Sequence, residues 1–363
     1  MKYIDEFRDK GLIYRIINQI KREANDLDTL TIMEVCGTHT MSSYRYGIRE
    51  LLPSNIRLVS GPGCPVCVSP ITYIDKSIAF SDKKDIIITT FGDMFRVPGS
   101  VSSLEREKAK GKDIRIVYSP MDSLEIAKQN GDRKVLFLGI GFETTAPLVA
   151  ATIIQANREG IRNYLVLSSH KTIPEPMQVL LDDNGLEIHG FLCPGHVSTI
   201  IGSLPYQFIP DRYKISCVIA GFEPFDILKA ILMVIRQVKS KRFSVEIEYS
   251  RVVKPEGNRV ALRYINEVFE RCDAEWRGLG TIPKSGLRIR EVYKRFDAEK
   301  EIYIEIKEGK GVKGCLCGDI LKGKIEPYEC SLFSIQCIPD NPLGPCMVSS
   351  EGTCAAYYRF SVK

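Results

Sequence analysis

Six of the twelve cysteines gather near the C-terminus, in a stretch rich in Gly and Pro. These six are Cys315, Cys317, Cys330, Cys337, Cys346 and Cys354. An iron–sulfur cluster takes four cysteine thiolates and a structural zinc takes at most four, so two thiols remain for another role. The spacing matches neither a zinc finger nor a ferredoxin. A loop-rich segment still needs a metal site or cross-link to hold it together. An iron–sulfur cluster is the better fit and zinc is the alternative.

Three further cysteines lie far upstream, in two Gly-rich segments. Cys64 and Cys67 form a C-x-x-C unit within G-P-G-C-P-V-C, a spacing that suits a dithiol/disulfide couple or half of a metal site. Cys36 lies in E-V-C-G-T-H-T, with His39 three residues on. We interpret Cys36 as a candidate soft metal ligand, and a small buried thiol at a strand end is the alternative.

Other side chains with possible chemistry follow apolar runs. Glu143, in G-I-G-F-E-T, is a candidate acid/base or hydrogen-bond acceptor, and a carboxylate stabilised at a helix N-terminus is an equal alternative. The same segment lacks the third glycine of a dinucleotide fingerprint. His170 and His196 are candidate proton shuttles or ligands, or ordinary loop histidines. The remaining thiols are interpreted as packed side chains: Cys193, Cys217 and Cys272.

Composition excludes several classes of function. The 50 basic and 45 acidic residues are mixed along the chain, which argues against nucleic-acid binding. No apolar run approaches the roughly 20 residues that span a bilayer. Residues 1–27 predict an amphipathic helix and not a signal peptide. We therefore expect a cytoplasmic protein whose reduced cysteines serve metal binding or redox chemistry.

Eight apolar, β-branched runs predict the strands that would position these residues. Most are continuously apolar, as in parallel strands buried on both faces, and helices are predicted between several of them. Ligands bind at the carboxyl ends of such strands, so two sheets facing each other would form one cleft. The predicted strands are Leu30–Val35, Ile56–Ser60, Asp85–Thr90, Ile114–Tyr118, Lys134–Ile140, Tyr164–Ser168, Gly190–Leu192 and Tyr213–Ala220.

These elements predict an α/β fold with two Rossmann-like parallel-sheet domains facing a cleft, plus a loop-rich C-terminal iron–sulfur domain. Four strands fall in residues 30–119, with Cys36 and the C-x-x-C unit, and four in residues 120–240. Residues 241–363 form the expected C-terminal domain, including a helix over Arg259–Cys272. Residues 1–29 are expected to pack on that domain.

The sequence resembles the hydrogenase maturation factor HypD family. The resemblance rests on E-V-C-G-T-H-T, G-P-G-C-P-V-C, G-F-E-T-T-A-P, C-P-G-H-V-S and G-P-C-M-V-S-S-E-G-T-C-A-A, which run from residue 34 to residue 356. It implies a scaffold on which the iron of nickel–iron hydrogenases receives cyanide and carbon monoxide. It also implies a complex with the small chaperone HypC and contact with HypE, which supplies cyanide from a cysteine-bound thiocyanate.

The resemblance also assigns residues. Cys36 would ligate the iron together with a cysteine of HypC. Cys64 and Cys67 would be a nearby redox pair, close enough to ligate iron too. A [4Fe–4S] cluster would be held by Cys315, Cys330, Cys337 and Cys354, and Cys317 with Cys346 would be a second dithiol. Electrons would then pass from the cluster through that dithiol to the C-x-x-C pair.

Two other functions fit the same residues. One is a stand-alone thiol–disulfide oxidoreductase fed by an iron–sulfur cluster. The other is a structural zinc protein that only bridges partners. The role of Cys36 separates the assembly scaffold from the oxidoreductase, because only the scaffold needs that thiol to hold iron.

Overall fold

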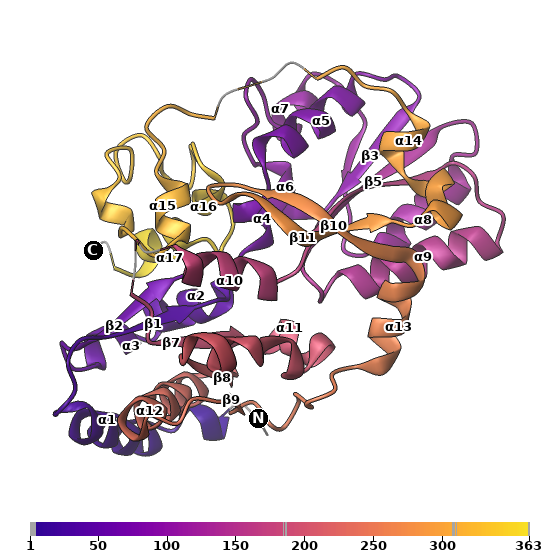
Figure 1. Cartoon of the computed structure of the whole chain (residues 1–363). Helices are drawn as coiled ribbons and strands as arrows, with labels where there is room; N and C mark the ends of the chain where they lie inside the picture. Colours follow the sequence, from indigo (N-terminus) through magenta and orange to yellow (C-terminus); the bar gives the residue numbers. More distant parts are fainter. Residues whose placement is uncertain (1–4, 184, 186, 307–308, 310, 362–363) are drawn as a thin grey trace.

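The computed structural model describes residues 5–183, 185, 187–306, 309 and 311–361, and contains two β-sheets (Figure 1). In sheet A all neighbouring strands run parallel, and its central strands are buried along their whole length, as their continuous apolarity predicts. Its strands, in spatial order, are β2 (Ile56–Ser60), β1 (Leu30–Glu34), β7 (Gly190–Pro194), β8 (Ser216–Ala220) and β9 (Val245–Ile247).

Sheet B is mixed. Four of its strands are parallel, and a long antiparallel hairpin is added at one edge. In spatial order they are β10 (Phe269–Trp276), β11 (Gly280–Ile289), β6 (Tyr164–Lys171), β5 (Lys134–Gly141), β3 (Ile86–Thr90) and β4 (Ile114–Ile116). The prediction of two parallel-dominated sheets is confirmed.

The two sheets do not follow the expected boundary between residues 119 and 120. The first two strands pair with β7 and β8 in sheet A, whereas β3 and β4 pair with β5 in sheet B. The chain therefore crosses from one sheet to the other after β2, after β6 and again after β9. These crossings bring loops from both halves of the sequence to one place.

Helices cover both sheets and connect the strands (Figure 1). None in the described part of the chain is long and apolar enough to cross a membrane. The helices are α1 (Lys10–Ala24), α2 (Gly37–Arg45), α3 (Ile48–Leu51), α4 (Pro65–Val68), α5 (Ile71–Ser81), α6 (Gly92–Phe95), α7 (Leu104–Ala109), α8 (Pro120–Gln129), α9 (Ala146–Arg158), α10 (Pro174–Asp182), α11 (Gly195–Ile201), α12 (Pro224–Ser240), α13 (Arg259–Val268), α14 (Ala298–Glu301), α15 (Cys317–Leu321), α16 (Pro345–Val348) and α17 (Thr353–Phe360).

The described residues also contain five helical turns that are not α-helical. Four are 3₁₀ turns, at Asp5–Arg8, Leu204–Tyr206, Glu291–Phe296 and Pro327–Glu329, and Ile209–Tyr213 is a π turn.

The N-terminal helix packs on sheet A and not on the C-terminal region, so that prediction was wrong. Helix α1 buries Ile16, Ile17 and Ile20 in a core shared with α12. Arg236 of α12 also forms an ion pair with Glu23 of α1. An amphipathic stripe predicts that a helix is covered, but not by which surface.

The helix expected over Arg259–Cys272 ends at Val268, and the chain continues as strand β10. The reason is a change in the spacing of the buried side chains along the chain. In Phe269–Trp276 more and less exposed side chains alternate, which suits an antiparallel strand and not a helix face.

The C-terminal region, residues 311–361, consists of short helices and loops that lie against α2 and α4 (Figure 1). Helix α17 packs on α2, where the rings of Tyr44 and Tyr357 meet edge-on at 5.5 Å. Ser349 donates a hydrogen bond to Asp93 of α6. These contacts hold the C-terminal region beside α2 and α4, the helices that follow the carboxyl ends of β1 and β2.

Candidate functional site

Cys36 follows strand β1 and lies at the N-terminus of α2. The backbone N–H groups of Thr38 and His39 lie near its thiol and act to lower its pKa, as expected at a helix N-terminus. Burial and the nearby Glu351 carboxylate outweigh these donors and raise the pKa of Cys36 to about 12. The thiol is therefore protonated at neutral pH.

The loop before the C-x-x-C unit lies directly against Cys36. A Cβ atom on Gly63 would be 2.4 Å from Cys36 Cα, and the Gly37 N–H donates to the Gly63 carbonyl at 3.2 Å. The two Gly-rich loops thus touch backbone to backbone, which only glycine permits here. This contact places Cys64 beside the loop that carries Cys36.

Cys64 and Cys67 form a close dithiol. Their Sγ atoms lie 2.6 Å apart, and the Cys67 N–H donates to Cys64 Sγ at 3.3 Å. The short helix α4 creates this proximity, since it begins directly after Cys64. Burial, followed by the neighbouring thiols of Cys346 and Cys64, raises the pKa of Cys67.

Cys346 connects this dithiol to the other C-terminal cysteines. Its thiol interacts with those of Cys317, Cys354 and Cys67, and these three lower the pKa of Cys346. Cys317 Sγ in turn lies 3.2 Å from Cys315 Sγ. The sulfur atoms therefore form a continuous series from the C-x-x-C unit into the C-terminal region, and Cys346 lies within it.

Five of the clustered cysteines line one small, otherwise apolar cavity: Cys315, Cys317, Cys330, Cys337 and Cys354. The apolar walls include Ile320 and Phe333. Thiolates in an apolar shell are the donor set of an iron–sulfur cluster, so these residues fit that group by their chemistry. Within the described residues, no three His, Cys, Asp or Glu side chains are already arranged around a single ion.

A cleft of about 540 Å³ lies between the two sheets, as the predicted loops implied. Loops from β1, β2, β5 and β7 line it, so both sheets contribute. Cys36 lies on its wall near Phe142, Pro194 and His196. The candidate iron ligand therefore faces a space large enough for a ligated iron and a segment of a partner protein.

His39 supports this wall but does not line the cleft. Its Nε2 atom lies 2.9 Å from the Gly221 carbonyl oxygen, so Nε2–H is the donor, and burial lowers the pKa of the ring. Nδ1 is buried and has no hydrogen-bond partner among the described residues. Phe222 stacks between His39 and His196, at 4.8 and 4.0 Å. A neutral His39 can therefore accept a proton only at Nδ1.

Glu143 is buried between β5 and α10, next to residues that line the cleft. Its Oε1 accepts the Ile173 N–H at the start of α10, and Oε2 has no partner in the described part of the chain. Burial raises the pKa of Glu143 to about 8, so the carboxyl group is mainly protonated at neutral pH. It could thus serve as a proton donor.

We predict a specific pH signature for Glu143. Its folded pKa of about 8 exceeds its ordinary value of 4.5, so folding takes up a proton between these values. The stability due to the neutral carboxyl group is complete below pH 4.5 and is lost as pH rises toward 8, by up to about 1.4 kcal/mol per pH unit. Glu143→Gln should remove this loss, measured as unfolding free energies from pH 5.5 to 8.

The exposed Glu125 provides the control, because Glu125→Gln should retain the wild-type pH dependence. Parallel stability curves for wild type and Glu143→Gln would contradict the assignment.

The remaining candidates lie outside this assembly. Cys193 and Cys217 are fully buried with their sulfur atoms 2.9 Å apart, which confirms them as packed thiols. Cys272 is half-buried and lines a separate surface pocket together with His170.

Sequence reasoning missed Glu351, which accepts a hydrogen bond from Thr38 at 2.7 Å and lies against Gly37. This glutamate belongs to the motif G-P-C-M-V-S-S-E-G-T-C-A-A, but the motif does not reveal its contacts, since Thr38 and Gly37 are over 300 residues away.

Comparison with known proteins agrees with the sequence motifs. A family model described as "HypD: Hydrogenase formation hypA family" matches residues 11–361. The hydrogenase maturation factor HypD of Rhodobacter capsulatus is 46% identical over 370 residues, covering 99% of this chain and 98% of that protein. The HypD of Cupriavidus necator is 47% identical over 368 residues, covering 99% and 97%. The hydrogenase expression/formation protein HupD of Azotobacter chroococcum is 45% identical over 367 residues, again covering 99% and 97%.

Proposed function

The chain belongs to the HypD family of hydrogenase maturation factors, and we propose that it is the scaffold on which an iron ion acquires cyanide and carbon monoxide. In this proposal Cys36 ligates the iron, which is the cargo, jointly with a cysteine of HypC in the cleft. Cyanide arrives from HypE. A thiolate suits low-spin iron with strong-field ligands. The site would work in the cytoplasm, where the twelve free thiols stay reduced.

The observation that carries the proposal is the continuous series of thiols that ends beside Cys36. Cyanide transfer from a sulfur carrier to iron requires reducing equivalents. The Cys64–Cys67 dithiol lies on the loop that touches the Cys36 backbone, and Cys346 connects it to Cys317. The proposed redox couple, Cys64 and Cys67, thus lies next to the proposed iron ligand. Cys346 connects this couple to the buried thiols of the C-terminal region.

Thiol–disulfide exchange can pass two electrons along this series. The Cys346 thiolate attacks Cys67 of an oxidised Cys64–Cys67 pair, and Cys64 leaves as a thiolate. Cys317 then attacks Cys346, which releases Cys67. The Cys64–Cys67 pair is reduced and a Cys317–Cys346 disulfide forms, so electrons balance. The lowered pKa of Cys346 favours it as the first nucleophile.

The C-terminal cavity is the proposed location of a [4Fe–4S] cluster, with Cys315, Cys330, Cys337 and Cys354 as ligands. The cluster, when bound, would supply one-electron redox chemistry. In this assignment Cys317, which also lines the cavity and interacts with Cys346, is the thiol that connects the cavity to the exchange series.

Replacement of Cys36 tests the scaffold function. Cys36→Ala, purified anaerobically with HypC, should lose the iron–cyanide and iron–carbonyl infrared bands, because the iron loses its ligand from this chain. Visible absorption of the iron–sulfur cluster should be unchanged, since Cys36 does not line the C-terminal cavity.

Cys272→Ala is the matched control, because Cys272 is remote from the thiol series and should retain the bands. Full infrared bands in Cys36→Ala would overturn the scaffold function. With the thiol series still active, that result would favour the stand-alone oxidoreductase, whose chemistry needs only the exchange thiols.

A further inference from the structure

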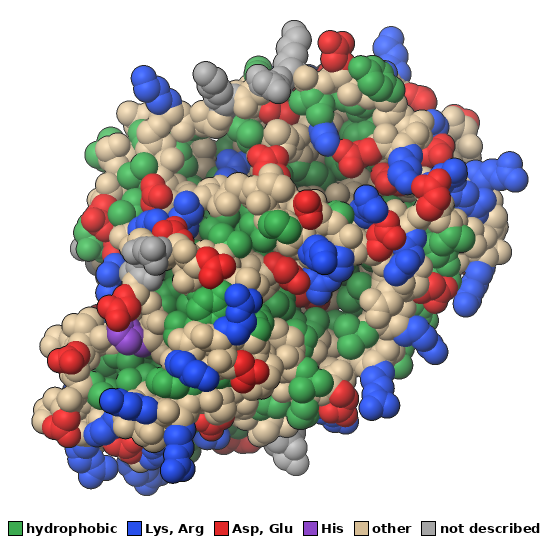
Figure 2. Space-filling model, viewed as in Figure 1, with side chains coloured by type: hydrophobic (Ala, Val, Ile, Leu, Met, Phe, Trp, Pro, Cys, Tyr) green, Lys and Arg blue, Asp and Glu red, His purple; other side chains and the backbone are tan. Residues whose placement is uncertain are grey.

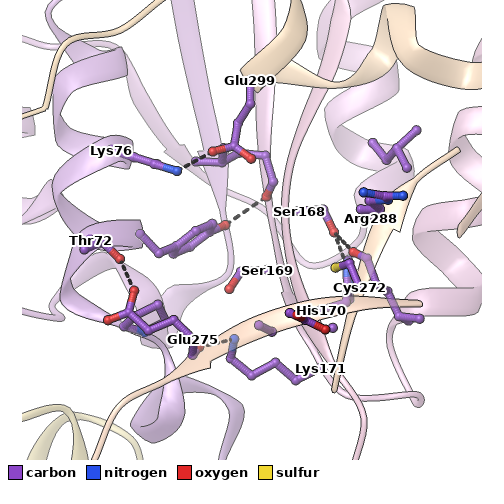
Figure 3. A pocket seen from close by; sticks show the side chains of 18 of the residues that line it. Thr72, Lys76, Ser168, Ser169, His170, Lys171, Cys272, Glu275, Arg288 and Glu299 are labelled. Carbon is purple, nitrogen blue, oxygen red and sulfur yellow. Dashed lines mark hydrogen bonds and ion pairs between the residues drawn. The ribbon is translucent and has the colours of Figure 1, made fainter. Parts of the chain in front are cut away.

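A second pocket, of about 240 Å³, opens at the edge of sheet B (Figure 3). It lies between α5, the end of β6 and the β10–β11 hairpin. The pairing of β6 with β11 joins Lys171 to Gly286 and His170 to Leu287, and residues from both strands line the pocket. The pocket fills this opening next to Ser168 and Ser169. It belongs to neither the cleft nor the thiol series.

The acidic side chains around this pocket all have partners. Glu275 accepts a hydrogen bond from Thr72 at 2.9 Å, and Glu299 forms an ion pair with Lys76 (Figure 3). Asp273 accepts the Lys284 N–H, and Asp297 caps α14 by accepting the Glu299 N–H. The carboxylates of the pocket are therefore already engaged.

Of the basic side chains around this pocket, two are paired with carboxylates and Lys171 is not. Lys76 is paired with Glu299, and Arg288 is paired with Glu270. Lys171, in contrast, is 3% exposed and donates to the backbone carbonyl of Glu275 at 2.7 Å. No carboxylate in the described part of the chain lies within 4.0 Å of its Nζ atom, although the charge of Glu275 acts on it from farther away. Buried ammonium groups normally pair with an anion, so Lys171 has unused capacity to bind one.

A second donor lies on the same side of β6. Ser169 is two residues from Lys171, so both side chains project from the same face of the strand. Figure 3 shows Ser169 in the middle of the pocket. Its hydroxyl makes no side-chain hydrogen bond among the described residues, although Ser168 binds the Leu287 carbonyl. The volume is below the 300–1,000 Å³ typical of drug-sized ligands, so only a small molecule fits.

We propose that this pocket binds a small carboxylate, whose charge pairs with the Lys171 ammonium group and whose oxygen accepts the Ser169 hydroxyl. A carboxylate offers one negative charge and two acceptor oxygens, which match the one unpaired cation and the one free hydroxyl. Ala274, Leu287 and Ile289 provide apolar wall for a short carbon chain.

Saturation-transfer NMR with propionate as the probe tests the site on the full-length chain. We expect transfer to the propionate protons, and no transfer to propionamide, which has the same shape without the charge. Lys171→Met should weaken propionate binding at least 10-fold, and Ser169→Ala about 3-fold. Methionine keeps the length of the side chain and removes a buried charge, so the fold should persist.

Lys284→Met is the matched control, since Lys284 lies on the same hairpin but is exposed, and it should bind propionate like wild type. Equal transfer to propionamide and propionate would overturn the proposal. Propionate binding that survives Lys171→Met would also overturn it. So would the absence of transfer from the wild-type chain to propionate at about 20 mM, a concentration well above a millimolar dissociation constant.

Discussion

Gly63→Ala is expected to lower the rate of hydrogenase maturation about 100-fold. The new Cβ atom would lie 2.4 Å from Cys36 Cα and N and 2.5 Å from the Val35 carbonyl carbon. All three are backbone atoms, so no side chain can rotate away. Restoring ordinary contact requires the loops to separate by roughly 1 Å, a displacement that can cost about 100-fold when two reacting groups must meet.

The measurement is hydrogenase activity in a strain whose own copy is deleted, together with the iron content of the purified complex with HypC. We expect both to fall while helix content by circular dichroism is retained. Gly131→Ala is the matched control, because Gly131 lies in an exposed turn with no heavy atom within 4 Å of the added Cβ. Wild-type iron content in Gly63→Ala would show that the loop contact does not position Cys36.

Arg49→Met is expected to lower the free energy of unfolding by about 3–5 kcal/mol. Glu34 at the end of β1 is fully buried, and its carboxylate pairs with Arg49 at 2.6 Å. Thr40 and Ser43 of α2 also donate to this carboxylate. Removing the guanidinium leaves a buried charge with only hydroxyl partners, which is far less favourable than the intact pair.

Guanidinium denaturation of the anaerobic protein measures this loss. Arg236→Met is the control, because its ion pair with Glu23 is exposed and should contribute no more than about 1 kcal/mol. Adding Glu34→Gln to Arg49→Met should recover part of the lost stability, because the unpaired charge is removed. A loss below 1 kcal/mol in Arg49→Met would contradict the buried-pair assignment.

This pair also explains how the site is held. Glu34 is two residues before Cys36, and its partners lie on α2 and α3. The network therefore fixes the angle at which β1 enters α2. We expect the stability of this junction, as well as the Cys36 thiol itself, to affect iron retention.

On the face of the molecule drawn in Figure 2, basic and acidic side chains are interspersed, so this face has no large area of a single charge sign. This agrees with the mixed charge of the sequence. On that face, partner recognition would rest on shape and specific contacts more than on a uniform field.

The closeness of the Cys64 and Cys67 thiols could be predicted from the sequence because it depends on residue type and short spacing. C-x-x-C brings two sulfur atoms together within one helical turn, and their 2.6 Å separation agrees. The strand positions were predictable for a similar reason. Continuous apolar runs are local patterns, and β1, β2, β3 and β5 follow them closely.

The pairing of strands was not predictable in the same way. Strands buried on both faces look alike in sequence, so nothing in β1 or β3 specifies its sheet. The amphipathic stripe of α1 likewise fits any apolar surface of suitable shape, and here that surface is α12. These choices depend on the free energy of the whole packed chain.

Short spacing along the chain specified the C-x-x-C unit and the loops that carry the thiols, because these properties arise within a few residues. The position of Cys346 between Cys67 and Cys317, and the contact of Glu351 with Thr38, depend on the folded chain. So does the burial of Lys171 away from any carboxylate oxygen of the described residues. Contacts between such distant segments follow from the packing of both sheets, which no local pattern encodes.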